Sequence, residues 1–206
     1  MLEKTRVYHA TNHWFREIDF AKTSAWTPKT DGEGPGLYFH LDKQSAVSYA
    51  RSRRLKYIYT IELFAAELED FTETENVDAY IRRIASVLEC ETGVDVLPVL
   101  ENNLRDIHPE IKDWNMFLGC VGGPNGQFQI VRLARQITEL AIPHLDGLTK
   151  TKRTALLRAA KAFDRNDAPA AYIFDYELQH GIIRNRDAGA KIVKWEVAEN
   201  ADPEQP

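Results

Sequence analysis

The sequence lacks the features that define several large classes of protein. It has two cysteines, Cys90 and Cys120, which are too few for a disulfide framework and do not stand in a metal-ligand spacing. It contains no run of about 18 apolar residues, and its first residues lack the apolar segment of a secretory signal. We therefore expect a cytoplasmic protein that uses no metal and no membrane, while export as an effector by a dedicated secretion machine stays open.

An excess of positive charge is also missing. The 206 residues include 26 Lys or Arg and 31 Asp or Glu, which gives a formal net charge of -5. Such a chain has no overall positive potential of the kind that attracts nucleic acid. Any nucleic-acid partner would therefore have to bind at a local cluster of basic residues. Basic residues gather at 51–56 and at 150–161, where solvated helix faces are their ordinary explanation.

What the sequence does contain is an α+β pattern. With 44% hydrophobic residues, a chain of this length can bury a core of its own. Alternating β-branched and aromatic residues predict strands at 5–10, 37–40, 56–64, 171–174, 178–184 and 191–197. Helical periodicity predicts a helix from Lys43, capped by Asp42, and three helices between about 74 and 165. We expect one domain over residues 1–198 with a helical insertion at 74–165, followed by a flexible tail at 199–206.

Two short motifs stand out in the first fifty residues. One is Tyr8-His9-Ala10-Thr11 at the end of the first predicted strand. The other is Gly34-Pro35-Gly36-Leu37-Tyr38-Phe39, a glycine-framed second strand that is followed by Ser45 and Tyr49. A histidine and a tyrosine that leave neighbouring strands in this way can converge on one small flat ligand.

Together the two motifs resemble the NAD pocket of the His-Tyr-Glu ADP-ribosyltransferases, the superfamily of diphtheria toxin and the poly-ADP-ribose polymerases. The resemblance covers about residues 5–65 well and residues 170–198 loosely. It implies a split β-sandwich with an NAD cleft between two small apposed sheets. It further implies that His9 holds the adenine-side ribose and that Ala10 presents its backbone to the nicotinamide carboxamide, with Thr11 beside it.

The second motif has implied roles as well. Tyr38 corresponds to the tyrosine that stacks on nicotinamide, within a segment formed by Gly36, Leu37, Tyr38 and Phe39. An ungapped comparison places Tyr49, eleven residues later, at the second stacking tyrosine of the polymerases. Ala10 replaces the usual glycine, which backbone contacts tolerate unless the ligand comes very close. Ala46 stands at the usual serine position, so either Ser45 supplies that hydroxyl or the contact is missing.

The catalytic glutamate of this superfamily has two competing positions here. One alignment places Ala171 there, which predicts a crippled enzyme. The other places Glu177 there, which leaves the family's usual interval to the end of the last strand, and we favour it. Glu196 is a weaker candidate because it comes too late in the chain.

The resemblance thus implies an enzyme that moves ADP-ribose from NAD to a macromolecular acceptor, more often a protein than a nucleic acid, and releases nicotinamide. His9, Tyr38 and Glu177 are its expected catalytic residues, and the chemistry requires no metal. A glycohydrolase of NAD and a catalytically silent module on the same fold remain as alternatives. An RNA 2'-phosphotransferase ranks low, because a second histidine is usual there in place of Tyr38. A fold without any NAD site remains as the last alternative.

Overall fold

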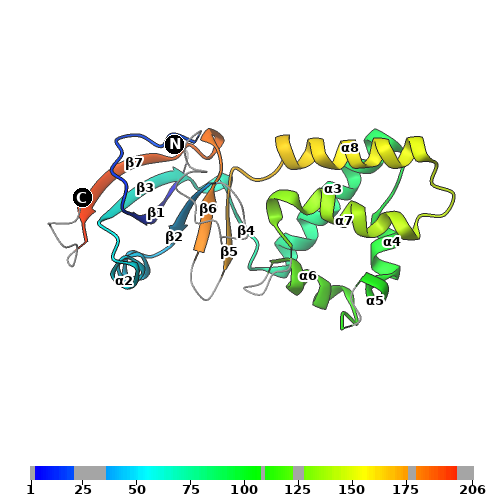
Figure 1. The fold of residues 1–206 in the computed structure, drawn as a ribbon, viewed down its shortest axis with the longest axis horizontal. Helices are drawn as coiled ribbons and strands as arrows, with labels where there is room; N and C mark the ends of the chain where they lie inside the picture. Colours follow the sequence, from blue (N-terminus) through cyan, green and yellow to red (C-terminus); the bar gives the residue numbers. More distant parts are fainter. Residues whose placement is uncertain (1–2, 21–35, 108–109, 123–127, 176–179, 199–206) are drawn as a thin grey trace. The chain divides into compact units, whose positions relative to one another are not determined.

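The computed structural model describes residues 3–20, 36–107, 110–122, 128–175 and 180–198. These residues form a mixed α+β fold with seven strands in one mixed sheet and seven α-helices. The chain divides into two compact units, one made of residues 1–70 and 169–206 and the other of residues 71–168 (Figure 1). The first unit contains the sheet, and the second is helical.

The strands agree closely with the sequence pattern. Their bounds are β1 Lys4–Thr11, β2 Leu37–His40, β3 Tyr57–Phe64, β4 Leu68–Asp70, β5 Ala171–Asp175, β6 His180–Ile183 and β7 Lys191–Val197. The order in the sheet is β4-β5-β6-β2-β1-β3-β7, and only β4 and β5 pair in parallel. The short strand β4 has no counterpart among the predicted strands.

The backbone pairing between β1 and β2, in the middle of the sheet, is the shortest in the sheet. β1 pairs with β3 along its whole length, from Lys4 opposite Phe64 to Thr11 opposite Tyr57. By contrast, a single register pair, Tyr8 opposite His40, joins β1 to β2. We expected two small apposed sheets; the strands form one hydrogen-bonded sheet whose halves, β4-β5-β6-β2 and β1-β3-β7, meet at that pair.

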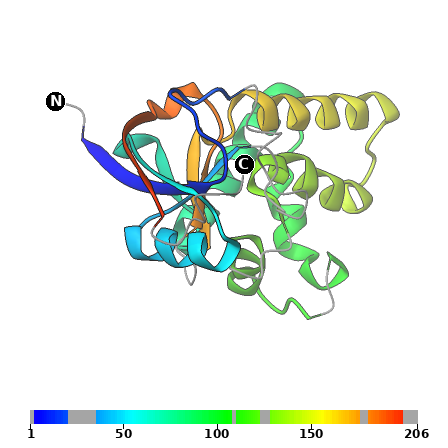
Figure 2. The ribbon, with the colours of Figure 1, turned by 60° about the vertical axis from the view of Figure 1, so that its left-hand side comes forward.

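Helix α2, Lys43–Arg53, follows β2 directly and covers one face of the sheet (Figure 2). It begins as the sequence predicted, because the Asp42 carboxylate accepts a hydrogen bond from the Ser45 amide at 2.9 Å. It ends at Arg54, which adopts a left-handed conformation with φ of 54°. Ala46 and Ala50 bury their small side chains against Ala10 and Ile58 of the sheet.

The opposite face of the sheet carries the larger core cluster of this unit. Val7, Leu37, Phe39 and Tyr59 are at most 1% exposed and pack there. Phe15, from the segment after β1, closes part of this cluster. Since Val7 and His9 share a face of β1, the predicted site histidine points toward this cluster rather than toward α2.

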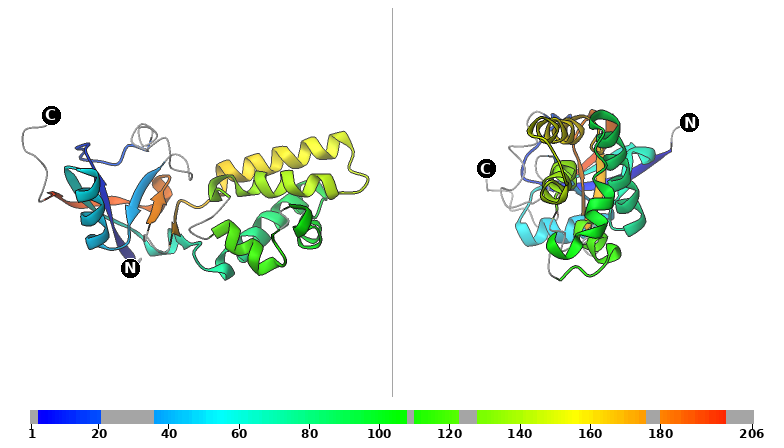
Figure 3. Two further views of the ribbon diagram at one scale, coloured as in Figure 1. Left: turned by 60° about the horizontal axis from the view of Figure 1, so that its bottom comes forward. Right: turned by 90° about the vertical axis from the view of Figure 1, so that its right-hand side faces the viewer.

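The helical unit has its own core. Its helices are α3 Thr74–Thr92, α4 Leu97–Asn102, α5 Leu104–Ile107, α6 Trp114–Gly122, α7 Leu133–Ala141 and α8 Lys150–Asn166. The three amphipathic helices predicted from the sequence correspond to α3, α7 and α8, and these three pack on one another (Figure 3). Their buried residues include Ile81, Ile84, Ile137, Leu156 and Phe163.

Candidate functional site

The two sequence motifs meet through one hydrogen bond. The Nδ1 nitrogen of His9, on β1, lies 2.6 Å from the backbone oxygen of Tyr38, on β2. These residues are 29 positions apart in the sequence. The structure therefore brings the His9 side chain to the backbone of Tyr38, at the point where the two halves of the sheet meet. The Tyr38 side chain alternates with Leu37 and Phe39 of the core cluster and so lies on the other face of β2, the face of α2.

This hydrogen bond defines the tautomer of His9. Burial lowers the pKa of His9 from 6.5 to about 4, a shift that the Tyr38 carbonyl opposes and the nearby His13 reinforces. The ring is therefore neutral at pH 7, and because a carbonyl oxygen can only accept, Nδ1 carries the proton. Nε2 is then a lone-pair acceptor. It is fully buried and has no hydrogen-bond partner among the described residues.

Two aromatic residues hold the histidine ring in place. Phe15 stacks on Tyr59 with ring centroids 4.2 Å apart, and the His9 ring lies 6.0 Å from Phe15 and 6.5 Å from Tyr59. The Tyr59 hydroxyl accepts from the Phe15 amide at 2.9 Å and donates to the His13 carbonyl at 3.3 Å. Burial raises the pKa of Tyr59, so this hydroxyl stays protonated. The segment after β1 is thus attached to β3 beside His9.

The remaining residues of the two motifs lie on both faces of the sheet. Ala10 is 9% exposed and faces α2, and Thr11 accepts a hydrogen bond from the His13 amide at 3.2 Å. Leu37 and Phe39 are each 1% exposed in the sheet core, so their side chains support the strand. Gly36 is confined, since a Cβ there would collide with the Ile182 side chain.

The second predicted tyrosine belongs to a separate ring cluster. Tyr49, on α2, lies 5.2 Å from the ring of His40 and 6.0 Å from the ring of His180. The two histidines face each other across β2 and β6 with ring centroids 4.3 Å apart. The Tyr38 ring packs edge-on against Phe174, with ring centroids 6.0 Å apart. The two tyrosines therefore pack on different rings.

Sequence reasoning missed His40, and it considered His180 only as a residue close after Glu177 that could contact the acceptor. His40 directly follows the glycine-framed motif, and His180 begins β6 exactly opposite it in register. The available signal was the predicted pairing of these two strands, which places both imidazoles on one side of the sheet next to Tyr49. We name His40, Tyr49 and His180 the histidine–tyrosine cluster.

Ser45, the candidate for a ligand hydroxyl, uses its backbone amide in the cap of α2. Its hydroxyl also donates to Asp42, and this bond is the main reason why the pKa of that carboxyl is lowered. Ala46 is fully buried beneath it. Ser45 therefore has a structural partner at the start of the helix.

The glutamate candidates have different outcomes. Glu177 lies outside the described residues. Ala171 is fully buried in the core of the sheet unit and is paired with both Leu68 and Ile183, so a carboxylate at this position would be buried among apolar residues. Glu196 binds Lys43 at 2.5 Å and Lys194 at 3.2 Å, and the bond to Lys43 is the main reason why its pKa is lowered. Glu196 is therefore part of the sheet surface.

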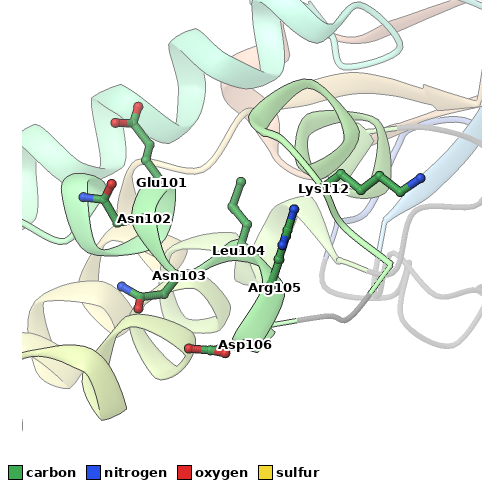
Figure 4. Close-up of a pocket in the computed structure, with 7 residues that line it drawn as sticks. All are labelled: Glu101, Asn102, Asn103, Leu104, Arg105, Asp106 and Lys112. Carbon is green, nitrogen blue, oxygen red and sulfur yellow. The ribbon is translucent and has the colours of Figure 1, made fainter.

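The helical unit contains a small hollow lined by residues 101–106 and Lys112 (Figure 4). Its charged residues have both signs, and Glu101 already binds Arg82 at 3.3 Å. None of the predicted site residues lines it. The hollow therefore offers no argument for a ligand.

Comparisons with known proteins add no family. No protein-family model, curated protein or solved structure matches the chain significantly. The site has to be interpreted from its own geometry.

Two further observations concern the described ranges alone. Within them, no helix combines the length and the apolarity that crossing a bilayer demands. The same ranges bring no three His, Cys, Asp or Glu side chains together as a metal-binding group.

Proposed function

We propose that the chain is an NAD-dependent ADP-ribosyltransferase, which transfers ADP-ribose from NAD to a macromolecular acceptor and releases nicotinamide. The observation that carries this proposal is the hydrogen bond from His9 Nδ1 to the Tyr38 carbonyl, with Nε2 left as a buried acceptor. A buried acceptor without a partner costs free energy unless a ligand donor meets it. A ribose hydroxyl is such a donor, and it is the group that the resemblance assigns to His9.

The sheet also supports the proposal. Its halves are joined by the single pair Tyr8 and His40, so backbone pairing between the strands that carry His9 and Tyr38 does not continue beyond that pair. A split β-sandwich of the ADP-ribosyltransferase type requires such a break in the pairing. The proposal of this fold therefore depends on the short pairing between β1 and β2.

In the proposed reaction the bond between nicotinamide and ribose breaks, the nitrogen leaves with the bonding electrons, and the acceptor attacks the oxocarbenium-like ribose. His9 orients the adenine-side ribose through Nε2, and the Ala10 backbone receives the carboxamide. Tyr38 packs on the nicotinamide ring, which stabilises binding by about 0.5–1.5 kcal/mol beyond burial. Glu177 is proposed to stabilise the developing positive charge and to orient the acceptor.

The test uses the full chain with NAD alone and with a cell lysate plus labelled NAD. Release of nicotinamide together with label on a macromolecule supports the transferase. Tyr38→Ala should weaken NAD use at least tenfold, whereas Glu177→Gln should spare NAD binding and abolish transfer. Tyr57→Ala is the matched control, because Tyr57 is also a half-buried strand tyrosine but lies on β3 beside Trp195.

The outcomes separate the alternatives. Nicotinamide release without any labelled acceptor would favour the glycohydrolase, and NAD binding without release would favour a silent module. Absence of a thermal shift with millimolar NAD would remove the proposal altogether. Full activity of Glu177→Gln would show that another residue performs the glutamate's role.

A further inference from the structure

Helix α8 has an exposed face on which every charge is positive. Lys150, Arg158, Lys161 and Arg165 are exposed and follow one another at helical spacing, with Thr154 between the first two. We name these four cations the basic stripe. It is about 22 Å long, from fifteen steps of 1.5 Å. Arg153 is exposed on the flank of the stripe.

The stripe lies opposite the buried side of the helix. Leu156, Ala159, Ala160 and Phe163 of α8 are buried, and α8 packs along α3 and α7 (Figure 1). The acid within α8, Asp164, is half-buried and caps α7 by accepting from the amides of Ala134 and Arg135 at 3.0 and 3.2 Å. It therefore does not neutralise the stripe.

Ion pairing within the fold does not account for these cations. None of the four forms a salt bridge with any acid in the part of the chain that the structure describes. Some cations elsewhere do have ion-pair partners: Arg82 on α3 binds Asp78 of the same helix and Glu101 of α4. The stripe is thus a row of positive charges in a chain whose net charge is -5.

The first turn of α8 adds a second argument. Lys150, Lys152 and Arg153 stand there, and no acidic residue does. Cations at a helix N-terminus are repelled by the positive end of the helix dipole and so destabilise the helix. Helix stability therefore does not explain this placement, whereas an external anion does, and departures from local rules of this kind concentrate at functional positions.

The surroundings of the stripe decide which anion fits. An anionic membrane binds helices whose apolar face is free to insert, but that face of α8 is buried. An acidic protein surface calls for an apolar centre, and the large exposed hydrophobic residues in the described ranges lie outside α8. A phosphodiester backbone needs only a row of Lys and Arg donors.

We propose that the basic stripe of α8 binds the phosphate backbone of a nucleic acid, independently of base sequence. This function is separate from the use of NAD and does not depend on it. The sequence alone favoured a solvated helix face for these residues. That interpretation changes because every charge on the exposed face of α8 is positive, because the four cations form no salt bridge within the described residues, and because the first turn of the helix carries cations and no acid.

The experiment measures binding of the full chain to a fluorescent 24-base-pair DNA duplex and to an RNA duplex of the same length, between 25 and 200 mM NaCl. The test variant carries K150Q, R158Q, K161Q and R165Q. The control variant carries K4Q, R6Q, K191Q and K194Q, four exposed cations of the sheet unit. Both variants lose four positive charges, and the control also loses the salt bridges of Lys4 and Arg6 with Glu62 and of Lys194 with Glu196. The melting temperature of each variant is therefore measured beside its binding.

We expect the wild type to bind at least one duplex, with a slope of log K against log salt near -4 for about four phosphate contacts. The test variant should bind at least tenfold more weakly at 100 mM salt and lose most of that slope. The control should stay within about threefold of the wild type. The double variant R158Q/R165Q should fall between them, which keeps the test decisive even where the quadruple variant folds poorly.

Three results would overturn the proposal: no binding to either duplex at 25 mM salt, equal losses in the test and control variants, or binding of polyglutamate or phosphatidylserine vesicles as tight as that of the duplexes. Binding to DNA, to RNA or to both supports it, and the comparison shows which backbone is preferred.

Discussion

His9 and Tyr38 are joined by a hydrogen bond of 2.6 Å between the imidazole Nδ1 of one and the backbone oxygen of the other. The bond crosses the weakest connection of the sheet, where a single register pair joins β1 to β2. It leaves Nε2 of a neutral, buried imidazole as an acceptor that no described residue meets.

His9→Ala should raise the dissociation constant for NAD by about two- to tenfold, because one hydrogen bond to a ligand hydroxyl contributes roughly 0.5–1.5 kcal/mol. Titration calorimetry or a thermal shift with NAD measures the change. His144→Ala is the control, since His144 is a half-buried histidine of the helical unit. Unchanged affinity in His9→Ala would exclude Nε2 as a ligand contact.

The lowered pKa of His9 predicts a pH dependence of folding. The folded chain protonates His9 near pH 4, whereas the unfolded chain does so near pH 6.5. Between these values the unfolded state binds more protons, so the free energy of unfolding falls as the pH drops from 6.5 to 4. The contribution is at most about 3 kcal/mol.

Urea unfolding at pH 7, 6, 5 and 4 measures this dependence in the wild type and in His9→Gln. The variant should be less stable at pH 7 and should lose less stability on acidification, because glutamine does not titrate. Identical pH profiles for the two proteins would show that other groups cause the acid sensitivity.

The sequence predicted the local elements well because their signals are local. Alternation identified β3 and β7, and Asp42 identified the start of α2. Between residues 97 and 122 the chain forms three short helices, α4 to α6, that the periodicity did not separate. A helix of four to nine residues contains too few turns to show a reliable period.

The candidate site was only partly predictable for a different reason. The proximity of His9 and Tyr38 followed from the resemblance, but the histidine–tyrosine cluster depends on three elements that meet only in the fold. His40, Tyr49 and His180 come from β2, α2 and β6. No spacing within the sequence reports the register that sets His40 opposite His180.

The histidine–tyrosine cluster predicts a difference between two variants of Tyr49. Tyr49→Phe keeps the ring that packs on His40 and His180, so NAD affinity and the melting temperature should stay close to those of the wild type. Tyr49→Ala removes two ring contacts, each contributing about 0.5–1.5 kcal/mol, and should lower both. If Tyr49→Ala lowers only the melting temperature, the cluster is structural and not part of the NAD site.

Asp164→Ala should destabilise the helical unit by about 1–2 kcal/mol. The Asp164 carboxylate on α8 accepts from the second and third amides of α7, those of Ala134 and Arg135, and Arg132, which precedes α7, provides no side-chain cap. Loss of such a cap costs about 0.5–2 kcal/mol. Thermal unfolding followed by circular dichroism measures the loss, and Asp164→Asn, which retains an acceptor oxygen, should recover part of it. Equal stability of all three proteins would contradict a capping role.

Gly181→Ala tests how β6 supports the strand that carries Tyr38. Gly181 lies opposite Phe39 in the β2–β6 pair, and an added Cβ would overlap the Phe39 ring and approach the Tyr172 backbone oxygen. The ring is 1% exposed in the core, so it has little space in which to move. Overpacking of this kind costs about 1–3 kcal/mol.

The matched control is Gly119→Ala on α6, where an added Cβ meets nothing within 4 Å. Because alanine is the better helix former, Gly119→Ala should leave stability unchanged or raise it by up to about 1 kcal/mol. Gly181→Ala should instead lower the urea midpoint and, by displacing β2, reduce NAD affinity together with stability. Wild-type stability of Gly181→Ala would mean that Phe39 can move aside, and the rigid support of Tyr38 by β6 would then be wrong.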